Sequence, residues 1–188
     1  VMSLLYGVVV YYLLLVIINK LHKTIIEPEV IENLKKLTVM FLFANLYFLF
    51  LYHLTNMYIS KHLEFEIFIL FNGGIYTAVF WLGQVLVGII LPLIFLLTNK
   101  ICSYFSLLIS SVFVLFGSFM SMFVIIIAGQ AYPLTIFPDH TIMESSFYDD
   151  VIHSYVPSIY ELGLGIGGTA LALIIVLIGL VNLKFLPK

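Results

Sequence analysis

Five apolar stretches divide the chain, and each is long enough to cross a membrane as a helix. They occupy residues 1–18, 37–58, 67–97, 101–128 and 158–186. About 20 helical residues cross the roughly 30 Å of bilayer hydrocarbon. A helix also satisfies its own backbone hydrogen bonds, which lipid cannot do. The pattern therefore predicts an all-α, polytopic transmembrane helix bundle of about five helices, forming a single transmembrane domain over residues 1–188.

The connections between these stretches differ in length and charge. Residues 20–36 hold four lysines, and we expect a short amphipathic surface segment after Pro28. Residues 60–66 and 98–100 form short connections. The longest connection, residues 131–157, contains acidic side chains and no lysine.

Lysine positions indicate the topology, because cytoplasmic loops of membrane proteins carry an excess of basic residues. If the first helix runs inward, only Lys61 lies outside. The lysines on the inner side are then Lys20, Lys23, Lys35, Lys36, Lys100, Lys184 and Lys188. We therefore predict an outward 131–157 loop and a cytoplasmic C-terminus.

Composition supports membrane insertion and narrows the chemistry. The chain is 63% hydrophobic and 10% charged, whereas soluble domains average about 45–50% and about 25%. It contains no arginine, so it offers no bidentate clamp for phosphate or carboxylate. Its one cysteine, Cys102, cannot form an internal disulfide or hold an iron–sulfur cluster alone. The net charge of −2 indicates no nucleic-acid partner, and no metal site is predicted.

Several polar residues fall inside the predicted spans. Such residues usually face the bundle interior or mark a function, because a polar side chain is unfavourable in hydrocarbon. They include Asn45, Tyr47, His53, Gln84 and Gln130. A quinone site needs apolar walls with a few such hydrogen-bonding groups. The alternatives are hydrogen bonds between helices for His53 and the glutamines, or interfacial anchoring of His53. Haem ligation is not expected, because the other histidines, His22, His62, His140 and His153, fall in connections.

The start of the last stretch carries two local signals. Ser158 and Glu161 have the spacing of a capping box, in which each side chain bonds the other residue's backbone N–H. The alternative role for Glu161 is that of a proton-accepting carboxylate. Gly163 and Gly167 have the G-x-x-x-G spacing that lets membrane helices approach closely, and Gly117 with Ser121 repeats it.

The last helix, SYVPSIYELGLGIGGTALALIIVLIGLVNLKFLP, resembles the end of the NrfD family, the membrane subunits of polysulfide, nitrite, tetrathionate and related reductases. The matching residues are Tyr155, Pro157, Ser158, Glu161, Gly167, Gly168, Leu186 and Pro187. Three earlier stretches resemble the family in the same order, namely FLFANLYFLFLYHLTNMY, FWLGQVLVGIILPLIFLL and FVIIIAGQAYPL.

The resemblance implies an eight-helix core of two bundles, of which this sequence would hold the last five helices. Residues 1–18, with Tyr11 and Tyr12, would then close the first bundle, where the resemblance places most of the quinone site near the outer face. We therefore expect this helix to pack against a helix outside the present sequence. The chain departs from the family at residues 120–122, Met-Ser-Met, where members often carry an arginine.

The resemblance implies a membrane anchor subunit of a respiratory oxidoreductase complex. It would exchange electrons between menaquinone, or a similar quinone, and an iron–sulfur partner that serves a catalytic subunit such as a molybdopterin enzyme. The expected location is the plasma membrane of a prokaryote, in contact with lipid. The alternatives are a proton-translocating or scaffolding subunit without its own quinone site, and a small transporter, although no internal repeat is apparent.

The outward loop is the expected docking platform for the iron–sulfur partner. Loops longer than about 12–15 residues are usually functional or disordered, and an iron–sulfur cluster must approach the quinone closely. The predicted docking residues are Asp139, Glu144, Asp149, Asp150 and Tyr155. The alternative is a solvated acidic loop.

The predicted topology is testable by cysteine labelling from each side of the membrane. Single cysteines in the 131–157 loop should react with an impermeant reagent added outside, and a cysteine at Lys188 only from the cytoplasmic side. Labelling of the loop from the cytoplasm alone would overturn the assignment.

Overall fold

The computed structural model describes residues 1–22, 27–98, 103–132 and 156–182, and these residues contain helices and no strand. They belong to two compact units, Val1–Val151 and Ile152–Lys188, which are described separately. The helices long and apolar enough to span a membrane are Met2–Lys20, Pro28–Tyr58, Ile75–Thr98, Tyr104–Ala131 and Ile159–Gly179. The all-α, polytopic fold predicted from the sequence is therefore confirmed.

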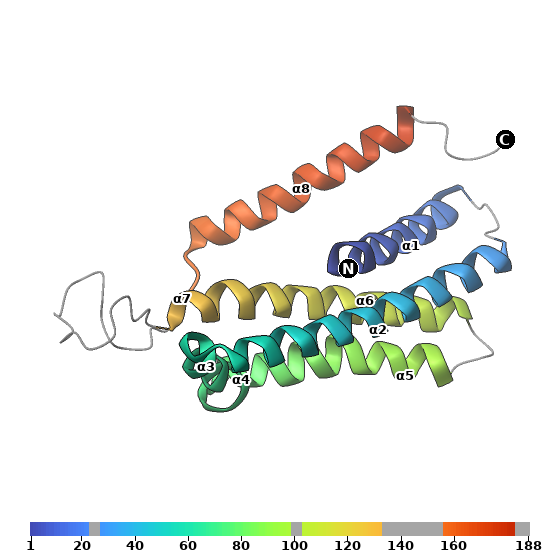
Figure 1. The fold of residues 1–188 in the computed structure, drawn as a ribbon. Helices are drawn as coiled ribbons and strands as arrows, with labels where there is room; N and C mark the ends of the chain where they lie inside the picture. The colour runs from blue at the N-terminus through green and yellow to red at the C-terminus, as the bar shows by residue number, and fades with distance from the viewer. Residues whose placement is uncertain (23–26, 99–102, 133–155, 183–188) are drawn as a thin grey trace. The chain divides into compact units, whose positions relative to one another are not determined.

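Four of these spans pack together in the first unit (Figure 1). Helix α1 (Met2–His22) contacts both α2 (Pro28–Tyr58) and α6 (Ser103–Met122). The third span consists of α4 (Ile75–Ala78), the π-helix η2 (Val79–Ile90) and α5 (Leu91–Thr98). The fourth continues from α6 into the π-helix η3 (Phe123–Ala128) and α7 (Gly129–Ala131).

Helix α2 begins nine residues before the predicted span at 37–58. Its first residue, Pro28, is favourable there, because a helix's first N–H has no partner within the helix. The lysine-bearing residues 28–36, predicted as a separate surface segment, are therefore the first turns of the same helix. Its buried residues recur every three or four positions, as one helical face requires: Ile31, Leu34, Thr38, Leu42, Asn45 and Leu49.

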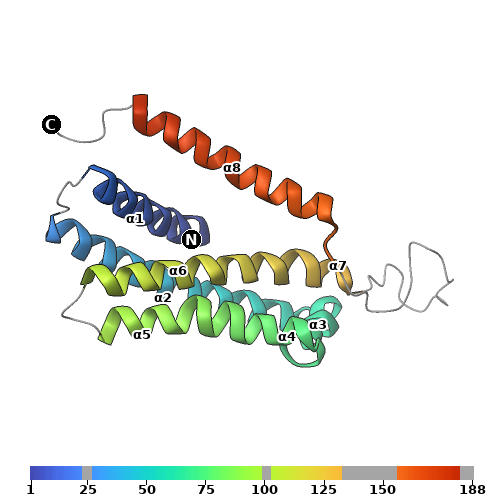
Figure 2. The ribbon, with the colours of Figure 1, turned by 180° about the vertical axis from the view of Figure 1, so that it is seen from behind.

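The continuous helix predicted over residues 67–97 is interrupted at Gly73 and Gly74. Gly74 has φ +56° and ψ −106°, a conformation that side-chain-bearing residues rarely adopt. Before this break lie α3 (Ser60–Ile67) and the π-helix η1 (Phe68–Asn72), where a connection was predicted over residues 60–66. In both views α3 lies beside the C-terminal end of α2, at the end of the bundle that also holds α7 (Figure 2).

Two side chains satisfy backbone groups that this break releases. The Thr77 hydroxyl accepts the Gly73 N–H at 2.9 Å and donates to the Phe68 carbonyl at 3.2 Å. The Trp81 Nε1–H donates to the Leu70 carbonyl at 2.9 Å. These bonds hold η1 against the start of the third span.

The third and fourth spans approach each other at two glycines. A Cβ on Gly88 would lie 2.8 Å from the Gly117 Cα, and a Cβ on Gly117 would overlap Gly88. One turn away, a Cβ on Gly83 would lie 2.8 Å from the Met120 Cγ. The predicted packing role of Gly117 thus has a defined partner, because backbones meet this closely only where both residues lack side chains.

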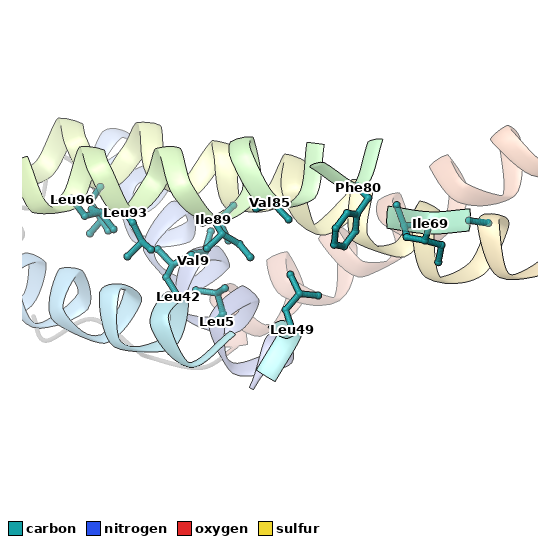
Figure 3. Close-up of a cluster of buried hydrophobic side chains, with 14 of the residues drawn as sticks. Leu5, Val9, Leu42, Leu49, Ile69, Phe80, Val85, Ile89, Leu93 and Leu96 are labelled. Carbon is teal, nitrogen blue, oxygen red and sulfur yellow. The ribbon is translucent and has the colours of Figure 1, made fainter. Parts of the chain in front are cut away.

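Apolar side chains from α1, α2 and the third span meet along the bundle (Figure 3). Leu5 and Val9 of α1 and Leu42 of α2 are almost completely buried, as is Ile89 of η2. Aromatic rings pack at the α3 end of the bundle, in contact through Phe65, Phe68, Tyr76, Phe123 and Tyr132.

The second unit contains α8 (Ile159–Asn182), within the predicted span 158–186, whose last four residues lie outside the described part. The predicted capping box is present. The Ser158 N–H donates to Glu161 Oε2 at 2.7 Å, and the Glu161 N–H donates to Ser158 Oγ at 3.3 Å. The packing role of Gly163 and Gly167 stays a prediction, as does the single domain over residues 1–188.

Replacement of Gly117 by valine should destabilise the folded protein by on the order of 1–3 kcal/mol, because the added side chain forces the third and fourth spans apart. Thermal unfolding of the purified protein in detergent measures the effect. Gly7→Val is the matched control, since a Cβ on Gly7 meets no described atom within 4 Å. Equal unfolding temperatures for the two variants would contradict the close-packing role.

Candidate functional site

The buried face of α2 becomes polar toward the helix's C-terminal end. Asn45 and Leu49 are buried, and His53 and Asn56 follow at the same three- to four-residue spacing. These side chains therefore lie along one side of the helix, facing α3 and the third span. His53 also contacts the edge of the Phe80 ring, with 4.8 Å between the ring centroids.

His53 and Asn56 both bind a buried carboxylate on α3. His53 Nδ1 lies 2.6 Å from Glu66 Oε2, and Asn56 Nδ2 donates to Glu66 Oε1 at 2.8 Å. The Glu66 side chain has no exposed surface, and that of His53 is 12% exposed. Both carboxylate oxygens are thus bonded, which offsets part of the free-energy cost of burying this group.

The pairing determines how His53 can react. With Glu66 ionised, its carboxylate can only accept hydrogen bonds, and the short contact then requires the imidazole proton on Nδ1. Nε2 is then the nitrogen left to bond another molecule. His53 therefore presents Nε2 as the one ring nitrogen that the contact with Glu66 does not occupy.

A cavity of about 660 Å³ lies beside this pair. Its volume is within the usual range for small-molecule sites, about 300–1,000 Å³. The walls are mainly apolar and come from the starts of α1 and η3, the C-terminal half of α2, and α3 with η1. The polar side chains lining it include Asn45, His53, Asn56 and Gln84. Asn45 and Gln84 are 5% and 4% exposed.

The structure brings together three of the predicted quinone or proton-path residues, namely Asn45, His53 and Gln84. Tyr12 is buried elsewhere, where its hydroxyl donates to the Tyr104 carbonyl at 2.7 Å and ties α1 to α6. Three further predicted residues have exposed side chains that do not line the cavity, namely Tyr11, Tyr47 and Gln130.

Other predicted residues belong to the second unit or to undescribed segments. Glu161 forms the capping box of α8. The docking residues Asp139, Glu144, Asp149, Asp150 and Tyr155 lie outside the described residues. Within the described part of the chain, no three His, Cys, Asp or Glu side chains are grouped to hold a metal ion.

Sequence reasoning missed Glu66, because residues 60–66 were assigned to a connection. One signal was present. Glu66 is followed by the apolar run Ile67–Phe71, and an ionisable residue beside such a run needs a partner. His53 also needs a partner, and the alternative of a hydrogen bond between helices is present in its contact with Glu66. His53 nevertheless lines the cavity as well, so the two interpretations are compatible.

A double-mutant cycle should detect strong coupling between His53 and Glu66. Each single change to leucine leaves a buried polar group without its partner, whereas the double change removes both. We expect a coupling free energy of about 1–3 kcal/mol in thermal or denaturant unfolding.

Glu32 and Lys36 form the control pair, because their side chains are 48% and 70% exposed and their charged atoms lie 3.9 Å apart. The coupling free energy between Glu32 and Lys36 should be about 0.3–0.5 kcal/mol, as is usual for exposed ion pairs on a helix. Additive effects at His53 and Glu66 would contradict the pairing.

Comparison with known proteins identifies one family. The family model described as "Polysulphide reductase, NrfD" matches residues 1–133, which include the cavity and the His53–Glu66 pair. No curated protein and no solved structure matches the chain. The matched region includes the first predicted helix, residues 1–18. It ends before the last predicted helix, residues 158–186, which carries most of the family motifs named in the sequence analysis. The chain belongs to the NrfD family and is a multi-pass membrane subunit of a polysulphide reductase-like complex.

Proposed function

We propose that this subunit exchanges electrons between a membrane quinone, menaquinone or a similar one, and an iron–sulfur partner subunit, with the quinone head group in the 660 Å³ cavity. The observation that carries this proposal is the His53–Glu66 pair at the cavity wall. A quinone needs an apolar cavity with a hydrogen-bonding group that also transfers a proton, and this site supplies both.

The bound quinone would supply the redox chemistry. It becomes a quinol when it gains two electrons and two protons. In the direction of quinol oxidation, the electrons leave for the iron–sulfur partner and the hydroxyl protons must leave the site. His53 Nε2 would accept one of the two protons, and the second would leave to the water at the outer face of the membrane. In the opposite direction, both protons would return by the same two routes. Phe48, Leu49 and Ile69 supply apolar walls of the cavity.

The predicted topology places this site near the outer face of the membrane, because α2 runs outward in that arrangement. The outward 131–157 loop would then dock the iron–sulfur partner, which in turn serves a catalytic subunit such as a molybdopterin enzyme. The membrane would be the plasma membrane of a prokaryote, with the C-terminus in the cytoplasm.

One observation also favours a second function, that of a proton-translocating subunit without its own quinone site. A buried ionisable pair is what a proton path through a membrane protein requires, and His53 with Glu66 forms one. The two functions differ in whether a quinone occupies the cavity.

Replacement of His53 by alanine should lower quinol affinity about 3- to 10-fold, the loss expected for one hydrogen bond from a quinol hydroxyl to Nε2, and should lower quinol-linked electron transfer by at least that factor. The measurements are equilibrium binding of the reduced form of a soluble naphthoquinone, solvent extraction of quinone from the purified complex, and quinol-dependent reduction of the partner subunit. The control is His62→Ala, which removes an exposed histidine of α3 that does not line the cavity.

Two outcomes would contradict the proposal. A parent complex that contains no extractable quinone and binds no naphthoquinone would leave the proton-translocating function. A His53→Ala complex with the binding and activity of the parent would remove His53 from the site, wherever the quinone binds.

A further inference from the structure

A second, much smaller cavity adjoins the same polar residues. It has a volume of about 10 Å³ and is lined by residues of α1, α2, η2 and α6. Asn45 and Gln84 line both this cavity and the larger one. Gly88 and Gly117 line it where the third and fourth spans meet most closely. Asn45 and Gln84 therefore lie between the small cavity and the proposed quinone site.

Buried oxygen atoms there have no hydrogen-bond partner among the described residues. They are Asn45 Oδ1 and Gln84 Oε1. The Ser121 hydroxyl is buried beside them, next to the Tyr6 hydroxyl of α1. Asn45, Gln84 and Ser121 line the small cavity and are at least nine-tenths buried. Buried polar groups in native proteins are almost always bonded to protein or to ordered water. In a membrane-spanning bundle, lipid offers no alternative partner.

The volume and the bonding groups both fit one water molecule. A cavity of roughly 10–15 Å³ is about the least that holds a water, which needs two to four polar partners. Water has two hydrogens to donate, and the cavity offers two amide oxygens to receive them. Its own oxygen can accept the hydrogen of the Ser121 hydroxyl. One water would thus satisfy both amide oxygens and bond Ser121.

We propose that a single structural water occupies this cavity, bridges Asn45 Oδ1 and Gln84 Oε1, and is held by Ser121. Since both amide oxygens then point at the water, the two amide N–H groups point toward the larger cavity. There they act as hydrogen-bond donors for a carbonyl oxygen of the ligand, while His53 serves as the proton-transferring group. This last role rests on the proposed quinone function, whereas the water site does not.

A structure of the intact complex, at a resolution that reveals ordered waters elsewhere in it, tests the water directly. We expect density in the small cavity within hydrogen-bond distance of both amide oxygens. A small cavity without density would overturn the inference, as would density contacting neither amide. The water with an empty larger cavity would support this inference and count against the proposed quinone function.

Ser121 also allows a test in solution, because it lines only the small cavity. Ser121→Val fills the space of the water, and Ser121→Ala removes one of its bonds while leaving room for it. We expect the valine variant to lose the density and to bind a soluble naphthoquinone about 10-fold more weakly, the equivalent of one hydrogen bond. The alanine variant should show a smaller loss in the same direction.

The control is Ser111→Ala on the same helix. Ser111 is fully buried, donates to the Leu107 carbonyl of its own helix at 2.7 Å, and lines neither cavity. Its naphthoquinone affinity should equal that of the parent. Unchanged affinity in both Ser121 variants, with the parent binding naphthoquinone, would overturn the amide-orienting role of the water.

Discussion

A carboxylate can be buried in a membrane-spanning bundle only if both of its oxygens are bonded, and Glu66 meets this condition through His53 and Asn56. The arrangement requires α3 to lie against the end of α2. The break at Gly73 and Gly74 permits this, because the chain leaves the direction of the third span there. Thr77 and Trp81 then bond the backbone groups that the break releases. The buried His53–Glu66 pair, the helix break and the cavity wall are therefore parts of one arrangement.

The same requirement explains where small residues occur. Gly88 and Gly117 bring the third and fourth spans together closely enough to enclose the polar side chains of Asn45 and Gln84. A larger residue at either glycine would separate the spans and open those amides to lipid, where they would lack partners. Close helix packing and burial of polar groups thus support each other in this bundle.

The sequence predicts the spans well, because hydrophobicity over about 20 residues follows directly from bilayer thickness. It also singles out His53, Asn45 and Gln84, since polar residues stand out within apolar runs. It does not reveal Glu66 as their partner, because pairing depends on how α3 turns back, and that is a tertiary property. Exposure of Tyr11, Tyr47 and Gln130 was likewise not predictable, because residue type alone does not give the direction of a side chain around the helix axis.

The polar residues on one face of α2 extend from the end of the helix toward the middle of the membrane. From Asn45 to Asn56 the helix rises by about 16 Å, at about 1.5 Å per residue. That is roughly half of the 30 Å hydrocarbon thickness. Polar groups on one helix face therefore extend from the end of the span toward its middle, while apolar residues such as Leu49 separate them. In the proposed function, the long apolar tail of the quinone would remain in lipid while its head group contacts His53. A hydrophilic substrate would gain little from walls that are mainly apolar. The mainly apolar walls therefore support the proposed lipid-soluble ligand over a water-soluble one.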